Sequence, residues 1–318
     1  MFFRYCSYGL LILMATLIPV AAHGMTESQP DVVAPDTMGT LVTTEWLSRH
    51  LDDPDLVVID CTVRMEPKEG GGIRTMSGRA IYEGGHIPSA RFADLKGDLC
   101  DVDSPLEFAM PTPEQFCAAM GALGVGDDSR VVLYDGFNSV WAARVWWMLR
   151  WVGFDRAALL DGGLRAWKAE ERPLSTEPAE HQTKQLTPNP RPELIADRDE
   201  VFAAINDDAV SLIDAMHEAH FRGMMALYDR PGHIPSASNI PTTAFFDESG
   251  RYRPHDELAA ICTGDREARV IIYCGAGVAA SCNAFVMCRL GFTDVAVYMA
   301  SLQEWAADPA NPLVVDKP

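Results

Sequence analysis

The sequence predicts an α/β protein built from two tandem copies of one fold. Its 318 residues are enough for about two domains. Short apolar runs alternate with segments of helical spacing, and this alternation is typical of a small parallel sheet wrapped by helices. With 48% hydrophobic and 22% charged residues, the composition is that of a globular protein with enough apolar side chains for two cores.

An internal repeat is the strongest evidence for two copies. The segment 131–154, VVLYDGFNSVWAARVWWMLRWVGF, is matched by 270–292, VIIYCGAGVAASCNAFVMCRLGF. The hexapeptide GHIPSA occurs at 85–90 and again at 232–237. Because the motifs follow in the same order in both halves, the chain contains the same domain twice.

The elements of the first domain are expected within residues 41–176. A helix is predicted over 44–51, where Thr43 or Thr44 can cap the first turn. The glycine-rich stretch between Met65 and Ser77 is too polar for a core element and is predicted to be a loop. The apolar runs that predict strands are 56–60, 131–134 and 157–160.

The segment 177–192 is predicted to be the linker between the domains. Its prolines stand among polar residues, so it should be extended and exposed. The second domain then occupies 193–318. Within it, a buried strand is expected at 270–273 and an apolar helix at 278–290.

The first residues have the pattern of an export signal. Arg4 precedes an apolar stretch over 9–22, which ends in the small residues that a signal peptidase recognises. We expect a signal peptide over 1–22 and a flexible lead-in over 23–40, with the mature protein periplasmic or secreted and not stably bound to a membrane. An uncleaved membrane anchor is the alternative.

Charge and cysteine content argue against nucleic-acid binding and against a metal site. The formal net charge of −19 argues against nucleic-acid binding, since no basic patch is available to neutralise phosphates. Of the eight cysteines, Cys6 lies in the signal, and an odd number remains, so at least one thiol is free of intramolecular pairing. Without a CxxC motif or histidines at ligand spacing, a metal site is not expected.

Cys274 is the candidate nucleophile. It follows an apolar strand and precedes a turn with Gly275 and Gly277, which opens an apolar helix. A sulfur in that place faces unpaired backbone N–H groups and the positive end of a helix dipole, and both favour the thiolate. The first copy has Asp135 instead. A buried structural cysteine is the alternative interpretation.

The backbone N–H groups after the cysteine are expected to cradle a thiolate, a persulfide anion or an oxyanion. They belong to Gly275, Ala276, Gly277, Val278 and Ala279. A cysteine-dependent phosphatase uses a similar loop but needs an arginine where this chain has Ala280. The sequence therefore disfavours phosphatase and arsenate-reductase chemistry.

These motifs resemble the tandem-domain rhodanese family, the thiosulfate and 3-mercaptopyruvate sulfurtransferases, over about residues 41–312. A strand ending in Asp, an HIP motif, a cysteine loop and a final helix ending in Trp occur in the family's order. The resemblance implies two rhodanese-like domains, of which only the second is catalytic. It also implies that a sulfane sulfur moves onto Cys274 as a persulfide and then to cyanide or a thiol, without metal or organic cofactor.

The resemblance points to further site residues, and the sequence departs from the family at some of them. Arg222 matches one of two arginines that hold the mercaptopyruvate carboxylate, but Met216 stands at the other position. His86 matches a histidine near the active cysteine, yet His233 lies in the same motif of the second copy, which favours a structural role. Met299 stands where relatives have an aspartate.

The expected function is a ping-pong sulfurtransferase that takes sulfur from a small-molecule donor, thiosulfate or 3-mercaptopyruvate, and gives it to cyanide or a thiol. The alternative is a persulfide carrier or redox-binding module that delivers sulfur to a partner protein. The altered positions Ala276, Met216 and Met299 support that alternative.

Overall fold

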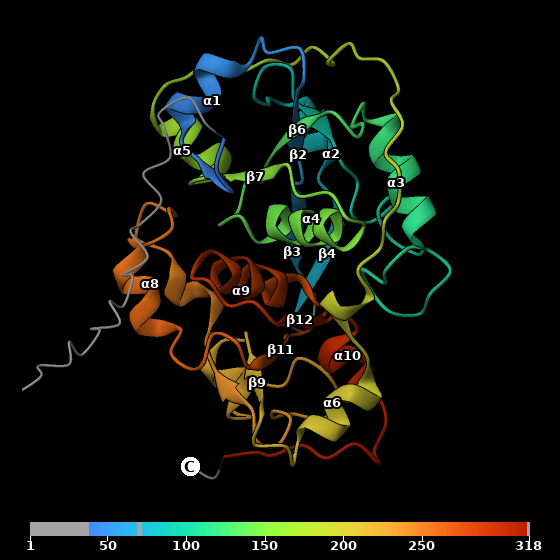
Figure 1. Cartoon of the computed structure of the whole chain (residues 1–318), viewed down its shortest axis with the longest axis vertical. Coiled ribbons are helices and arrows are strands. Elements are labelled where there is room, and N and C mark those ends of the chain that lie inside the picture. The colour runs from blue at the N-terminus through green and yellow to red at the C-terminus, as the bar shows by residue number, and fades with distance from the viewer. Residues whose placement is uncertain (1–37, 69–71, 317–318) are drawn as a thin grey trace, which may run out of the picture.

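The computed structural model describes residues 38–68 and 72–316. It contains two α/β domains, the first in the upper half and the second in the lower half of Figure 1. The predicted signal peptide and all but the last residues of the predicted lead-in lie outside the described residues.

The first domain is a five-stranded parallel sheet with the strand order β1-β7-β6-β2-β5. Its strands are β1 (Leu41–Val42), β2 (Leu56–Asp60), β5 (Arg91–Phe92), β6 (Arg130–Tyr134) and β7 (Ala157–Leu160). Its helices are α1 (Thr44–His50), α2 (Arg79–Glu83), α3 (Pro113–Ala122), α4 (Val140–Trp151) and α5 (Gly163–Ala169).

The second domain repeats this topology, with the order β8-β12-β11-β9-β10. Its strands are β8 (Ile195–Ala196), β9 (Val210–Asp214), β10 (Ser238–Asn239), β11 (Arg269–Tyr273) and β12 (Val295–Tyr298). Its helices are α6 (Arg198–Ala204), α7 (Glu218–Phe221), α8 (His255–Ile261), α9 (Val278–Arg289) and α10 (Ser301–Trp305), with a 3₁₀ turn at Thr242–Phe245. The prediction of two copies of one α/β fold is confirmed.

Local sequence signals account for these elements. The Thr43 side chain caps α1 by accepting a hydrogen bond from the backbone N–H of Trp46. Thr112 and Gln115 form a reciprocal capping box at the start of α3. The central strands β6 and β11 are apolar along almost their whole length because helices cover both faces of each sheet.

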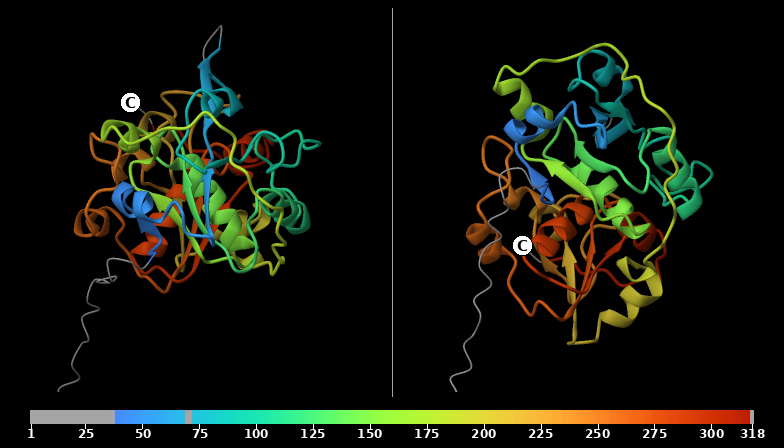
Figure 2. Two further views of the ribbon diagram at one scale, coloured as in Figure 1. Left: turned by 90° about the horizontal axis from the view of Figure 1, so that it is seen from above. Right: turned by 45° about the horizontal axis from the view of Figure 1, so that its top comes forward.

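The stretch predicted as a loop between Met65 and Ser77 is instead part of a hairpin. Strands β3 (Val63–Pro67) and β4 (Ile73–Ser77) pair antiparallel and project from the body of the molecule (Figure 2, left). The prediction was wrong because nearly all residues of these strands are exposed or only half-buried, so their pairing and the ion pairs of Glu66 stabilise them rather than a buried apolar face.

The segment between α5 and the 3₁₀ turn Pro192–Leu194 contains no helix and no strand. It runs along the outside of the first domain before entering the second (Figure 1). At one point it lies close against α3, where the backbone N–H of Lys184 donates to the carbonyl oxygen of Gly121 at 3.0 Å. A Cβ on Gly121 would lie 2.5 Å from the carbonyl oxygen of Lys184, so this contact requires a glycine.

Helices α4 and α9, one from each copy, lie side by side between the domains (Figure 1). The rings of Trp146 and Phe285 meet edge to face, 4.9 Å apart, in their shared core. Asp161 accepts a hydrogen bond from the backbone N–H of Tyr252 at 2.9 Å at another point between the two domains. Within the described residues, no helix has the length and apolar character needed to cross a bilayer.

Candidate active site

Cys274 is the first residue after β11, at the carboxyl end of that strand, and its side chain is 2% exposed. Three residues, 275–277, separate it from the start of α9. The first turn of α10 holds this loop: the backbone N–H of Leu302 donates to the carbonyl oxygen of Cys274 at 3.1 Å. The thiol therefore lies where ligands bind in open α/β sheets, beyond a strand end and at the start of a helix.

The equivalent loop of the first domain shows what such a loop can bind. One carboxylate oxygen of Asp135 accepts hydrogen bonds from the N–H groups of Phe137 and Ser139, at 2.6 and 3.1 Å. The other oxygen accepts from Trp141 and Ala142, both at 2.9 Å. Burial raises the pKa of Asp135 to about 7, and the N–H bonds act against that rise. The cradle of the first domain is thus filled by its own carboxylate.

In the second copy, Cys274 stands at the position of Asp135. Trp141 and Ala142 are the second and third residues of α4, and their counterparts in α9 are Ala279 and Ala280. The first N–H groups of a helix have no intrahelical carbonyl partner, so those of α9 are suited to an anionic sulfur. Of the predicted cradle, the N–H of Gly277 is already engaged, because it donates to the Ser301 hydroxyl at 3.1 Å.

Gly275 is in close contact with residues outside the loop. Its carbonyl oxygen accepts hydrogen bonds from the Tyr228 hydroxyl at 2.9 Å and from the backbone N–H of Gln303 at 3.1 Å. A Cβ there would lie 2.9 Å from Leu227 Cδ2 and 3.8 Å from Met216 Sδ. The atoms nearest to this position also include the Tyr228 hydroxyl at 3.3 Å, and none of the three belongs to a basic residue.

Arg144 is a site residue that the sequence analysis missed. It comes from α4 of the first domain, is 2% exposed and donates from Nη2 to the carbonyl oxygen of Phe108 at 2.6 Å. Its Nη1 lies 3.2 Å from Met299 Sδ, and its Nη2 lies 3.4 Å from Met110 Sδ. A Cβ on Gly277, which has a φ of +73°, would lie 2.5 Å from Nη1.

The charge of this buried guanidinium has no carboxylate counter-ion among the described residues. Burial lowers the pKa of Arg144 to about 10, and negative charge on Cys274 acts in the opposite direction. A cation held in this way is suited to face an anion that forms at the thiol. One feature of the sequence could have pointed to Arg144: the fifth residue of α4 is charged, whereas the fifth residue of α9 is Cys282.

Arg222, the predicted donor-binding arginine, is paired with two carboxylates in the structure. Arg222 follows α7, and its guanidinium forms ion pairs with Glu218 at 2.7 Å and Asp316 at 3.9 Å. Its side chain is 51% exposed, so both pairs are open to solvent. No contact between Arg222 and Cys274 occurs in the part of the chain that the structure describes.

His86 has a structural environment. Its Nδ1 lies 2.8 Å from the carbonyl oxygen of Tyr82, and its Nε2 lies 3.1 Å from that of Glu177 in the linker. His233 repeats the arrangement in the second domain, with Nδ1 2.7 Å from the carbonyl oxygen of Phe221. Both rings are buried and stack on an aromatic neighbour. The geometry supports the structural interpretation of this histidine.

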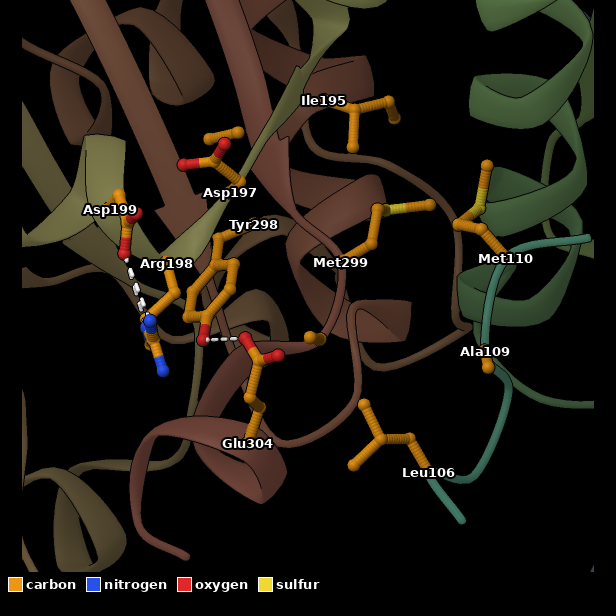
Figure 3. Close-up of a pocket in the computed structure, with 12 residues that line it drawn as sticks. Leu106, Ala109, Met110, Ile195, Asp197, Arg198, Asp199, Tyr298, Met299 and Glu304 are labelled. Atoms are coloured by element: carbon orange, nitrogen blue, oxygen red, sulfur yellow. Dashed lines mark hydrogen bonds and ion pairs between the residues drawn. The ribbon is translucent and has the colours of Figure 1, made fainter. Parts of the chain in front are cut away.

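A cavity of about 470 Å³ lies between the domains, and Met299 forms part of its wall (Figure 3). Cys274 does not line it, so the cavity is distinct from the Cys274 loop. Met110 and Met299 line the cavity and also contact Arg144, so the two sites share a wall. Charged and phenolic groups lie on the opposite side of the cavity: Asp197, Arg198, Asp199, Tyr298 and Glu304.

Comparison with known proteins agrees with this geometry. The model of the rhodanese-like domain matches twice, over residues 43–170 and 197–308.

The chain belongs to the rhodanese family.

Among its curated relatives is a probable 3-mercaptopyruvate sulfurtransferase from Pseudomonas aeruginosa, 33% identical over 285 residues, which are 86% of this chain and 97% of the relative. A thiosulfate sulfurtransferase from Cricetulus griseus is 31% identical over 83% of this chain and 91% of its own. The crystal structure of the 3-mercaptopyruvate sulfurtransferase SseA from Escherichia coli superposes with a TM-score of 0.74 at 32% identity, covering 83% of this chain and 99% of SseA. This rhodanese-family member is a sulfurtransferase.

Proposed function

We propose that this rhodanese-family enzyme moves a sulfane sulfur from 3-mercaptopyruvate or thiosulfate to a thiophilic acceptor through a persulfide on Cys274. The observation that carries the proposal is the pair of equivalent loops. In the first domain the cradle holds the carboxylate of Asp135, whereas in the second the thiol of Cys274 follows the strand and meets the start of α9. A loop that binds an anion in one copy is suited to bind an anionic sulfur in the other.

In the first half-reaction, the Cys274 thiolate attacks the transferable sulfur of the donor, which is the outer sulfur of thiosulfate or the thiol sulfur of 3-mercaptopyruvate. With thiosulfate, the S–S bond breaks and sulfite leaves with the bonding electron pair. With 3-mercaptopyruvate, the C–S bond breaks, and the thiol proton of the donor ends on the methyl carbon of pyruvate. In both cases Cys274 carries a persulfide anion, held by the N–H groups at the start of α9 and by the charge of Arg144.

In the second half-reaction, the acceptor attacks the outer sulfur of the persulfide. With cyanide, a C–S bond forms, the S–S bond breaks, and thiocyanate leaves. The electron pair of the broken bond returns to Cys274 as the thiolate, so the enzyme is restored without an external oxidant or reductant. The same groups that bind the persulfide hold the restored thiolate.

Sulfur transfer to cyanide by the purified protein tests the proposal. Thiosulfate and 3-mercaptopyruvate are compared in steady-state and single-turnover experiments with the Cys274→Ala variant. We expect turnover with at least one donor and complete loss in the variant, because Cys274 is the single cysteine of the segment 274–279 that forms the predicted cradle. Cys288→Ala is the matched control, since Cys288 is a free and partly exposed cysteine of α9, the helix that follows the Cys274 loop; it should keep full activity.

Two outcomes would contradict this function. Turnover that persists in Cys274→Ala would place the chemistry elsewhere. A Cys274 persulfide that forms but is not released to small acceptors would instead support a carrier that serves a partner protein. The engagement of Arg222 by two carboxylates is the structural observation that favours this second function, because it leaves one fewer cation for a small anionic donor.

We also propose that the protein is exported and that its mature form is periplasmic or secreted. The apolar stretch 9–22 behind Arg4 and the small residues at its end support a cleaved signal. N-terminal sequencing of the protein from cell fractions tests this. A mature N-terminus near His23 is expected, and a cell-associated protein that retains Met1 would contradict it.

A further inference from the structure

We propose that Ser301 is the positioning residue of the Cys274 loop: it fixes both ends of the loop and supplies a hydroxyl that stabilises the ionised sulfur. Ser301 is the first residue of α10 and is fully buried, and nothing in the sequence motifs distinguishes it from an ordinary serine at a helix start. Three observations carry the inference: its backbone conformation, its hydrogen bonds and its counterpart in the first domain.

The backbone of Ser301 adopts the left-handed conformation, with a φ of +54°. The corresponding residue of the first domain, third after the last strand in each copy, is Gly163, with a φ of +51°. Glycine adopts this conformation without strain, whereas a residue with a Cβ does not. The catalytic copy thus retains a strained serine where the inert copy has a glycine, and such strain is typical of functional positions.

The hydroxyl of Ser301 makes the contacts that the glycine cannot. Its Oγ accepts hydrogen bonds from the backbone N–H groups of Cys274 and Gly277, both at 3.1 Å. It donates its proton to the carbonyl oxygen of Tyr298 at 2.6 Å. One buried side chain therefore holds the first and last residues of the loop 274–277.

The same oxygen lies 4.0 Å from Cys274 Sγ. The hydroxyl has a single proton, so it can donate either to the Tyr298 carbonyl oxygen or to the sulfur. Rotation about the Cβ–Oγ bond exchanges these acceptors without transferring the proton. When the sulfur is ionised, the charge-assisted hydrogen bond is the stronger one. Ser301 thus adds a side-chain donor to the backbone groups of α9 and to Arg144.

Comparison with the first domain supports a role of the Ser301 hydroxyl at the Cys274 loop. A Cβ on Gly163 would lie 2.5 Å from the carbonyl oxygen of Asp135, so the first domain has no room for a side chain there. In that domain, Asp135 itself accepts the N–H bonds of the loop. Cys274 accepts hydrogen bonds from loop N–H groups less effectively than a carboxylate, because sulfur is a weak acceptor until it ionises. In the second domain the Ser301 hydroxyl accepts two of these hydrogen bonds instead.

Two variants separate this role from folding. Ser301→Gly removes the hydroxyl and relieves the backbone strain, whereas Ser301→Ala removes the hydroxyl and keeps the strain. The matched control is Ser236→Gly, because Ser236 in the same domain also has a positive φ, of +66°, but belongs to the GHIPSA turn. Melting temperatures confirm that each variant is folded, and Ser301→Ala should melt below Ser301→Gly.

The first readout is the rate at which iodoacetamide alkylates Cys274, followed by mass spectrometry of its peptide over a range of pH. In both Ser301 variants we expect the midpoint of the pH–rate profile to move up by about one unit or more, the size of one lost charge-assisted hydrogen bond. The Ser236→Gly profile should match wild type. An alkylation profile of Ser301→Gly that coincides with that of Ser236→Gly would overturn the inference.

The second readout is kcat/KM for sulfur transfer, which rests on the proposed function. It should fall about 10- to 100-fold in both Ser301 variants, with the loss mainly in kcat. Unchanged kcat/KM in both variants would also contradict the proposal. If the wild-type protein transfers no sulfur, the proposed function fails, and the alkylation profile still decides the role of Ser301.

Discussion

Arg144 links the first domain to the Cys274 loop at the level of one residue. Its guanidinium reaches from α4 across the domain boundary to Gly277 and lies between the sulfur atoms of Met110 and Met299. Thioethers are weak acceptors and carry no charge, so they do not neutralise it. The charge therefore remains available to an anion at Cys274, and the first domain contributes a group that the second domain lacks.

Replacing Arg144 by Met should remove this contribution while retaining most of its volume. We expect kcat/KM to fall by about 10²-fold or more, the usual effect of losing one preorganised donor at a developing charge. The free energy of unfolding should change little, because the lost hydrogen bond is offset by release of a buried charge from its desolvation cost. Steady-state kinetics and thermal melts measure both quantities.

Arg150→Met is the control, because Arg150 lies on the same helix but pairs with Asp155 at the surface. It should keep full activity. An Arg144→Met enzyme that is as active as Arg150→Met would show that the buried charge has no part in sulfur transfer.

At the level of elements, the strand that ends in aspartate is the feature shared most closely by the copies. Asp60, the last residue of β2, and Asp214, the last residue of β9, each accept a hydrogen bond at Oδ1 from the N–H two residues on, at 2.8 and 2.7 Å. In both, the buried Oδ2 has no hydrogen-bond partner in the described part of the chain. Burial raises the pKa of both carboxyl groups, that of Asp214 to about 6.

This shift makes stability depend on pH in a definite direction. The folded pKa of Asp214 lies above its unfolded value, so its contribution is fully present below about pH 4 and is lost as the pH rises through about 6. Asp214→Asn keeps the acceptor for Met216 and cannot ionise. We expect its free energy of unfolding to match wild type near pH 4 and to exceed it by about 1–3 kcal/mol at pH 8. Urea unfolding at both pH values measures the difference.

Asp265→Asn provides the control, because Asp265 accepts the same kind of bond, from the N–H of Glu267, at the protein surface. Its effect should be the same at both pH values. An Asp214→Asn difference that does not grow with pH would contradict the burial argument.

At the level of the whole molecule, the two copies form one functional unit through the packing of α4 against α9. Phe285 is fully buried in this interface, where its ring contacts Trp146 and Tyr252. On the side of the thiol, the Gln303 side chain accepts from the backbone N–H of Glu107 and donates to its carbonyl oxygen, both at 2.9 Å. The interface thus places Arg144 of one domain against the cysteine loop of the other.

Phe285→Ala should therefore impair both stability and activity. We expect the free energy of unfolding to fall by about 3–5 kcal/mol, the usual cost of deleting a buried aromatic ring. Activity per folded molecule should also fall, because the cavity allows α4 and its arginine to shift. Denaturant melts and kinetics at a temperature where the variant is folded measure these effects.

Phe202→Ala is the comparison, since Phe202 is 50% exposed. It should cost less than about 1 kcal/mol and leave kinetics unchanged. A Phe285→Ala enzyme with normal kcat/KM would show that Arg144 holds its place without this packing.

Local sequence patterns predicted much of the fold. The strands at 56–60 and 157–160 have the predicted bounds, and α9 ends one residue before the prediction. The position of Cys274 between a strand and a helix also followed from its neighbours alone. The hairpin β3–β4 was missed because exposed strands carry no apolar alternation, and their pairing partner was not visible in the pattern.

The sequence alone predicted the duplicated α/β fold and placed the candidate cysteine between a strand and a helix, because strand runs, glycine turns and helix starts are encoded by residues close together in the chain. Only the tertiary structure revealed that Arg144 and Ser301 meet the cysteine loop, and that Arg222 is held by Glu218 and Asp316. These contacts join elements far apart in the sequence, and they arise from the packing of two domains and from one strained backbone angle, neither of which follows from local spacing.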